Sequence, residues 1–174
     1  MSFDVTFTLT RRVGLAVFIG AMMSLASCQV RPLYSESSGV VEKLKAVEFS
    51  AATTRIEQEV RNRLIFLASG GAGEPAKADY TVELHARSDV TETLLLAQIS
   101  DDSRAGRVTV SVDYTLKSKT DGRVIKAGNR YATALVDFTE QQFAKQRAIR
   151  DGENRAAREA AELVGADIAS ALGR

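Results

Sequence analysis

The chain has 174 residues, 45% of them hydrophobic and 26% charged, which is enough for one domain with a modest core. Its 23 lysine and arginine residues nearly balance 22 aspartate and glutamate residues, and this neutrality argues against a nucleic-acid partner, whose phosphates require a basic surface. The single cysteine excludes an internal disulfide, so its presence needs another explanation.

Residues 1–27 have the layout of a secretory signal peptide. Two arginines precede fifteen uncharged residues, and this run is shorter than the ~20 residues that a transmembrane helix needs. It ends in Leu25-Ala-Ser-Cys28, which resembles the bacterial lipobox. We therefore expect cleavage between Ser27 and Cys28. Acylation of Cys28, with palmitate among the chains, is then expected to anchor the mature chain to a membrane.

The mature chain is expected to begin with a tether. Residues 28–43 include a polar stretch with Pro32 and Gly39, which suits an acylated N-terminus and a short link to the fold. No aspartate follows Cys28 directly, which by similarity to sorted lipoproteins favours the outer membrane over the inner one. The remainder, residues 44–174, is predicted to form a single domain.

The domain is predicted to open with a strand and a helix. Residues 45–49 favour a short strand, and Thr54 with Glu57 forms a capping box at the start of the helix. An apolar stripe with helical spacing continues to Leu67, and the glycine-rich run that begins at Ser69 ends the helix.

Alternating apolar and polar residues predict the next three strands. Tyr80–Arg87 and Val108–Lys117 both have the alternation of half-buried antiparallel strands. Thr120-Asp-Gly122 predicts a hairpin turn that leads into a last strand through Tyr131–Phe138. An irregularity in that last strand is predicted at Ala127-Gly128.

The C-terminal third predicts one long helix. Thr139 and Gln142 form a second capping box, and Phe138 and Phe143 flank it as a hydrophobic staple. The apolar face of the helix consists mostly of small residues, which suits close packing on a sheet, and Asp167 is the exception within this face. Several arginines are predicted to face water: Arg147, Arg150, Arg155 and Arg158.

The order strand, helix, three strands, helix predicts an α+β fold. We expect a two-layer sandwich in which a mostly antiparallel four-stranded sheet carries two helices on one face. The other face of the sheet stays open in this arrangement, and such a surface often binds a partner. The pair Asp151-Gly152 predicts a kink in the last helix.

No constellation of residues indicates catalysis. His85 is the only histidine, so neither a zinc site nor a Cys/His pair can be completed around it. Asp101 and Asp102 lie in a predicted irregular connection over residues 94–106, where they are expected to be solvated turn residues. The run from Ser69 to Gly73 lacks the lysine of a phosphate-binding loop. We therefore predict a non-enzymatic protein without a metal or cofactor.

The remaining candidate site is basic. Lysines and arginines gather on the third and fourth predicted strands and their turn, where they could grip phosphate groups. The alternative is a solvated rim that protects the sheet edges, to which Lys119 also belongs. The candidate binding residues are Arg104, Arg107, Lys117, Arg123, Lys126 and Arg130.

Three blocks of sequence together resemble the LptE family of lipopolysaccharide-assembly lipoproteins, in its alphaproteobacterial form. The first is Arg31-Pro-Leu-Tyr34, shortly after the predicted lipidated cysteine, and the second is Arg61–Leu67 with its glycine-rich stop. The third is Gln142–Ala148 running into Asp151–Ala157. The chain departs from the family at Gln29-Val30, where members often have Gly-Phe.

The resemblance implies an assembly role without catalysis. Family members plug the lumen of the β-barrel translocon LptD, help it to assemble, and bind lipopolysaccharide on its way to the outer leaflet. By this resemblance the six basic residues become candidate lipopolysaccharide contacts, and the protein is expected on the periplasmic side of the outer membrane. The main alternative is an auxiliary periplasm-facing lipoprotein of a lipid-transporting ABC system, and only the partner separates the two.

Overall fold

The structure, a computed structural model, describes residues 39–93, 104–138 and 141–173. The predicted signal peptide, Cys28 and most of the predicted tether lie outside these residues. In chain order the elements are α2 (Val40–Lys45), β1 (Val47–Phe49), α3 (Arg55–Ser69), β2 (Tyr80–Thr93), β3 (Arg104–Ser118), β4 (Val124–Phe138) and α4 (Gln142–Leu172). Within the described residues, no helix is long and apolar enough to cross a membrane.

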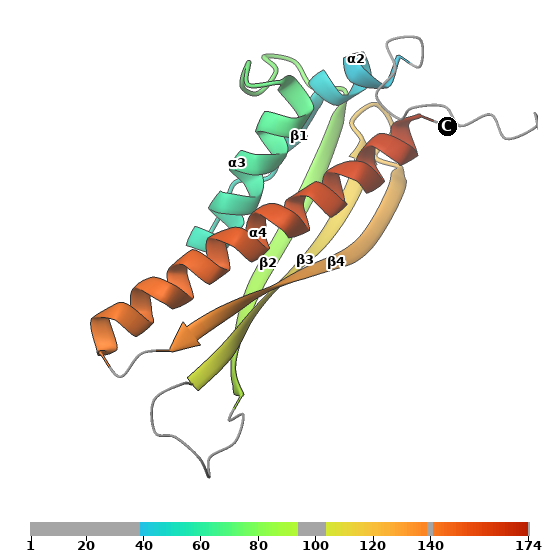
Figure 1. Ribbon diagram of the computed structural model, residues 1–174. Helices are drawn as coiled ribbons and strands as arrows, with labels where there is room; N and C mark the ends of the chain where they lie inside the picture. Colours follow the sequence, from blue (N-terminus) through green and yellow to red (C-terminus); the bar gives the residue numbers. More distant parts are fainter. Residues whose placement is uncertain (1–38, 94–103, 139–140, 174) are drawn as a thin grey trace, which may run out of the picture. The chain divides into compact units, whose positions relative to one another are not determined.

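The sheet confirms the predicted α+β fold. Its four strands follow one another in the order β1-β2-β3-β4 (Figure 1), and both the β2–β3 and the β3–β4 pairs are antiparallel. Strand β1 pairs parallel to β2, with Val47 opposite Tyr80. Helix α3 connects these two strands, and a helical crossover returns the chain in the same direction, which explains the parallel pair.

Helices α3 and α4 cover one face of the sheet, as the sequence predicted (Figure 1). The buried apolar residues of the strands point toward them, and the residues that alternate with these point away. Members of the core from both layers are less than 2% exposed: Val60, Leu64, Val82, Val110, Val112, Leu116, Ala156, Ala160, Val164 and Ile168. The opposite face of the sheet carries no helix among the described residues.

Helix α2 was not predicted, and it covers the last residues of the predicted tether. Val40 and Leu44 are both buried in the core. The Lys43 ammonium group donates a hydrogen bond of 2.7 Å to the backbone carbonyl of Leu172, which ties α2 to the end of α4. Six residues are too few for a clear helical periodicity, and tertiary packing therefore decides this segment.

The start of α3 confirms the predicted N-cap. The Thr54 hydroxyl accepts a hydrogen bond of 3.1 Å from the backbone N–H of Glu57. The Glu57 carboxylate also accepts bonds from the Thr53 hydroxyl at 2.6 Å and from the Ala86 N–H at 3.3 Å. The bonds from Thr53 contribute most to lowering the pKa of Glu57, although its side chain is buried. Glu57 thereby joins α3 to the edge of β2.

The irregularity in β4 lies two residues earlier than predicted. Leu116 pairs with Lys126 but Lys117 pairs with Val124, so that Ile125 is the extra residue on β4. Gly128 has a different explanation, because a Cβ atom at this position would lie only 2.9 Å from the Tyr114 hydroxyl oxygen. The glycine therefore allows the tyrosine ring to cross β4.

Helix α4 runs continuously from Gln142 to Leu172, and Figure 1 shows no break at the predicted kink Asp151-Gly152. Gly152 instead permits close packing of the helix on the sheet. A Cβ atom there would lie 2.8 Å from a methyl carbon of Val136 and 3.2 Å from one of Val108. A glycine in a helix thus signals a close approach here rather than a bend.

Candidate functional site

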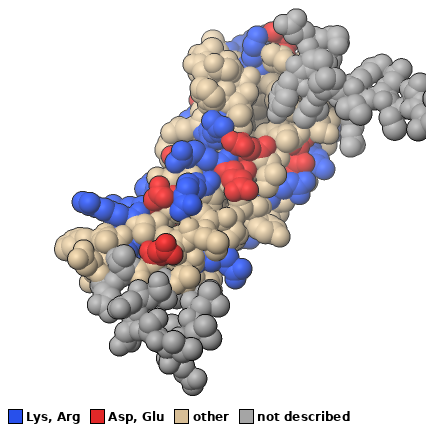
Figure 2. All heavy atoms as spheres, in the orientation of Figure 1, with Lys and Arg blue, Asp and Glu red and all other residues tan. Residues whose placement is uncertain are grey.

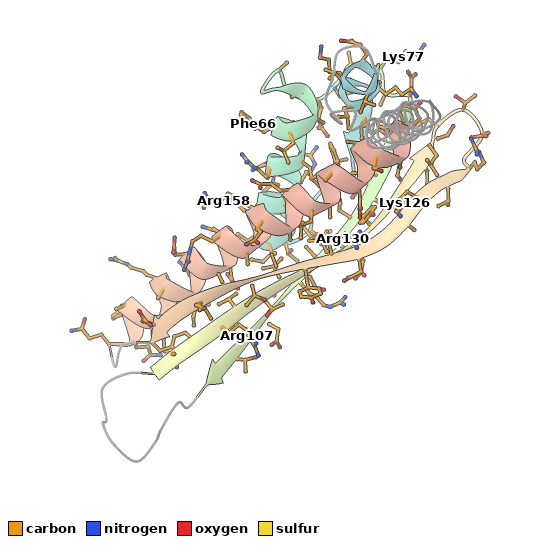
Figure 3. The ribbon with its side chains drawn as sticks, turned by 45° about the vertical axis from the view of Figure 1, so that its right-hand side comes forward. Phe66, Lys77, Arg107, Lys126, Arg130 and Arg158 are labelled. Carbon is orange, nitrogen blue, oxygen red and sulfur yellow. The ribbon has the colours of Figure 1, made fainter. Side chains whose placement is uncertain are left out.

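The structure separates the six predicted basic residues between the two faces of the sheet. Arg107 and Lys117 alternate with the buried residues of β3 and therefore lie on the open face. Lys126 and Arg130 pair with the buried Leu116 and Val112, and lie on the side that α4 covers (Figure 3). Arg123 is in the hairpin turn, and the side chain of Arg104 lies outside the described part. The six residues therefore do not form one site.

Lys117 takes part in a ladder of ion pairs on the open face. Its ammonium group lies 2.6 Å from the Glu83 carboxylate, and the Lys119 ammonium lies 2.9 Å from that of Glu48. The hydrogen bond from Lys119, followed by that from Thr81, lowers the pKa of Glu48. This half of the open face, which we call the proximal half, therefore carries charges that are already paired.

Two further pairs complete the neutralisation. The Arg87 guanidinium lies 2.8 Å from the Asp113 carboxylate, which also accepts a bond of 2.7 Å from the Asn129 amide. That amide bond, and after it the one from Arg87, lowers the pKa of Asp113 despite partial burial. In the turn, Arg123 lies 3.5 Å from Asp121. Lys117 and Arg123 therefore have local acidic partners, as a solvated rim would.

Arg130 belongs to a polar cluster between α4 and the sheet, and this cluster gives Asp167 its role. The Asp167 carboxylate accepts a hydrogen bond of 2.6 Å from the Tyr114 hydroxyl and one of 2.9 Å from the Arg130 guanidinium. Burial acts to raise the pKa of Asp167, but these two bonds and the nearby charge of Lys126 outweigh it, so the pKa is lowered. Burial, and next the bond to Asp167, raises the pKa of Tyr114.

Arg107 has different surroundings. It lies on the open face between Thr91 of β2 and Leu135 of β4, and it forms no ion pair with any residue that the structure describes. Two large hydrophobic side chains are exposed on the same face. Leu135, which is directly opposite Arg107, is 75% exposed, and Tyr131, four residues earlier on β4, is 66% exposed. We call Arg107, Tyr131 and Leu135 the distal sheet patch. An unpaired cation beside exposed apolar side chains suits an amphiphilic anion.

The start of α4 contains exposed residues that the sequence reading did not select as a site. The predicted cap residue Thr139 lies outside the described residues, and the helix begins at Gln142. Phe138 is buried, but Phe143 is 84% exposed, so the staple pair does not bury both rings. Arg147 and Arg150 are exposed, as predicted. The sequence did contain a signal for this exposed surface, because the helical spacing places Phe143 on the same side of the helix as Arg147 and Arg150.

The residues that were set aside as functional candidates show no site either. His85 is 84% exposed, and its nearest acidic group, the Glu57 carboxylate, is 3.8 Å away. Asp101 and Asp102 lie outside the described residues. Helix α3 ends at Ser69, and Gly70 adopts the left-handed conformation of a C-cap, which confirms the predicted helix stop. No cluster of three or more potential metal ligands occurs within the described ranges.

Comparison with known proteins points to one family. Residues 43–168 match the family described as "LptE: Lipopolysaccharide-assembly". No curated protein matches the sequence.

Among solved structures, a candidate lipoprotein from Caulobacter crescentus CB15 is 26% identical, with a TM-score of 0.60 over 78% of this chain and 96% of its own. Rare lipoprotein B from Shewanella oneidensis is 15% identical, with a TM-score of 0.48 over 72% of this chain and 92% of its own. The family match spans the four described strands, helix α3, and helix α4 as far as Ile168. The chain therefore belongs to the LptE family of lipopolysaccharide-assembly proteins.

Proposed function

We propose that this protein is the lipid-anchored partner of an LptD-type outer-membrane β-barrel, that it plugs the barrel and helps it to assemble, and that it assists insertion of lipopolysaccharide into the outer leaflet. Membership of the LptE family carries this proposal. The anchor would be Cys28, acylated after cleavage behind Ser27, and would hold the protein on the periplasmic side of the outer membrane.

The open face of the sheet supports the role of a plug. A large barrel has a polar lumen, and a protein that enters it must bury charged surface without leaving charges unpaired. On the proximal half of the open face, ion pairs inside this chain already satisfy Lys117, Glu83, Arg87 and Asp113. This surface can therefore lie against a polar wall at little cost in desolvated, unpartnered charge.

The distal sheet patch supports contact with lipopolysaccharide. Of the six basic residues, Arg107 combines an unpaired guanidinium group with exposed apolar neighbours, as a phosphorylated glycolipid requires. Lys126 and Arg130 form a second basic group beside α4 (Figure 3), but Asp167 competes for Arg130 there. We therefore assign the main lipid contact to Arg107 and subordinate contacts to Lys126 and Arg130.

The partner decides the proposal. The acylated, tagged protein is extracted from its native envelope in detergent, captured, and its companions are identified by mass spectrometry. We expect a large outer-membrane β-barrel in near-equal amount. Recovery of inner-membrane transport subunits would instead support an auxiliary lipoprotein of a lipid-transporting ABC system, and recovery of neither would contradict both functions.

A further inference from the structure

Three residues on one side of the first turns of α4 form an exposed stripe. Arg147 and Arg150 follow Phe143 by four and seven positions, which places all three on one face of the helix. On the buried side of the same turns, Ala148 and Ile149 pack against the cluster of Val108, Val136 and Phe138. The helix is therefore fixed to the sheet in an orientation that directs these three residues outward. We call them the α4 stripe.

The charges of this stripe lack local neutralisation. The segment Gln142–Arg150 contains three basic residues and no acidic one, and neither Arg147 nor Arg150 forms an ion pair with a described residue. The next arginines along the helix differ, because Arg155 lies 3.0 Å from Asp151 and Arg158 lies 3.2 Å from Glu59. Figure 2 shows basic atoms reaching outward where α4 begins.

The stripe keeps its positive charge without help from the helix end. The partial charge of a helix end acts within the first turn, and Arg147 and Arg150 lie in the second and third turns of α4. Their two guanidinium groups alone make the stripe complementary in charge to an anion.

Phe143 adds a requirement for an apolar environment. It is the most exposed of the large hydrophobic side chains in the described part of the chain, at 84%. An apolar pocket of the described part lies elsewhere, between Leu44, Phe49, Leu64 and Ile168 at the other end of α4. A lone aromatic ring on a convex, basic helix face is typical of insertion between lipid headgroups, whereas a protein partner would favour a concave or broader apolar patch.

We propose that the α4 stripe is a docking site for the surface of a phosphorylated lipid assembly, with Phe143 inserted among the acyl chains and Arg147 and Arg150 bound to phosphate groups. This inference rests on the proposed function and extends it, because it places a second lipid contact on the helical layer, apart from the distal sheet patch on the open face.

The chain contains no tryptophan, so that a single Phe143→Trp substitution provides a specific reporter. The probe consists of vesicles of phosphatidylglycerol, compared with vesicles of phosphatidylcholine. The protein is the mature chain with Cys28→Ser, so that acyl chains do not anchor it. We expect the tryptophan emission to shift to shorter wavelength, and iodide quenching to fall, with the anionic vesicles only.

Two matched variants make the test specific. Val124, the first residue of β4, is 52% exposed and lies at the opposite end of this strand from α4; it serves as the control site for the reporter, and Val124→Trp should show no shift. In the Phe143→Trp background, Arg147→Glu should abolish the shift, while Lys77→Glu, the same charge reversal outside the stripe, should preserve it. Thermal unfolding of each variant checks that the fold is intact.

The alternative outcomes overturn the proposal in distinct ways. Equal shifts at positions 143 and 124, or a shift that survives Arg147→Glu, would show that the stripe is not the docking site. A shift with polyglutamate but not with phosphatidylglycerol would indicate an acidic protein partner instead. If the stripe fails this test while the captured protein still brings down the barrel, the proposed function stands without it. A positive shift without recovery of the barrel would contradict the proposed function and leave the α4 stripe as a lipid-docking site.

Discussion

The two ends of this domain treat their charges in opposite ways. At the proximal end, around α2, β1 and the end of α4, several lysines and arginines are paired with carboxylates or backbone carbonyls, as in the pairs Lys119–Glu48 and Arg130–Asp167. At the distal end, where α4 begins, Arg107, Arg147 and Arg150 have no ion-pair partner among the described residues and lie near exposed apolar side chains. In our proposals, the paired charges of the proximal end stabilise the fold, and the unpaired charges of the distal end bind lipid.

The largest expected effect is a difference in stability between alanine substitutions of two leucines, one at each end. Leu64 is 1% exposed in the proximal core and Leu135 is 75% exposed in the distal sheet patch. Leu64→Ala should lower the free energy of unfolding by about 3 kcal/mol, because it leaves a cavity in a close-packed core. Leu135→Ala, the matched control, should change it by less than about 0.5 kcal/mol. Urea unfolding measures both, and similar losses for the two would contradict the division between the ends.

A smaller loss of stability should follow removal of the Asp167 carboxylate. Asp167→Ala leaves the Tyr114 hydroxyl and the Arg130 guanidinium without their acceptor in a partly buried place, and should cost about 2 kcal/mol. The exposed Asp137→Ala is the control and should leave the stability nearly unchanged. If Asp137→Ala were equally damaging, the cluster would not be what stabilises this end.

The stability that the Asp167 carboxylate contributes should depend on pH. Because the pKa of Asp167 is lowered in the folded protein, its contribution is present above the ordinary carboxyl value of 3.8 and is lost as the pH falls through the lowered pKa. The stability gap between the wild type and Asp167→Ala should therefore be constant near neutral pH and narrow below about pH 4. A gap that widens in acid would show the opposite sign of coupling.

Lipid binding should distinguish two basic residues of the open face. Arg107→Gln should weaken lipopolysaccharide binding about tenfold, since one charge-assisted hydrogen bond contributes roughly 1.5 kcal/mol. Lys117→Gln removes a charge that Glu83 already neutralises, so the affinity should change little. Titration of the detergent-solubilised protein with the lipid measures both constants. Equal losses would mean that net charge, rather than the distal sheet patch, governs binding.

The smallest effect should come from the ion pairs that join the two long helices. Arg63 lies 2.6 Å from Glu162, with both side chains partly exposed to solvent. A double-mutant cycle with Arg63→Ala and Glu162→Ala should give a coupling free energy of about 0.5 kcal/mol, and this value should fall as salt is added. A coupling that is independent of salt would show that the pair is shielded from solvent.

Periodicity was sufficient to predict most of this fold. The alternation in β2 and β3 and the stripe from Ile56 to Leu67 predicted these three elements, because each buries one face against the other layer. Both strands are longer than predicted: β2 continues past Arg87 to Thr93, and β3 begins at Arg104, inside the predicted irregular connection. Helix α2 was not predicted, because contacts with α4 stabilise its six residues, and the local sequence pattern does not reveal such contacts. Gly128 and Gly152 were read as local breaks, although both accommodate groups from distant parts of the sequence.

The candidate site was less accessible from sequence, because proximity along the chain does not reveal pairing across strands. Lys117 and Arg107 looked equivalent as basic residues on one strand. They differ because Glu83, diagonal to Lys117 on β2, forms an ion pair with it, whereas Arg107 has no such partner among the described residues. Asp167 was recognised as an exception in an apolar face, but its partners on β3 and β4 depend on the packing of α4.

The length of α4 has a consequence for where the two ends can act. Its 31 residues, at ~1.5 Å each, make a straight rod of about 46 Å. A lipid bilayer with its headgroups measures about 40–45 Å across, nearly the same. If the domain stands in a barrel with α4 along the membrane normal, the helix acts as a ruler. Its end beside α2 then lies at the periplasmic headgroups, and its start lies at those of the outer leaflet.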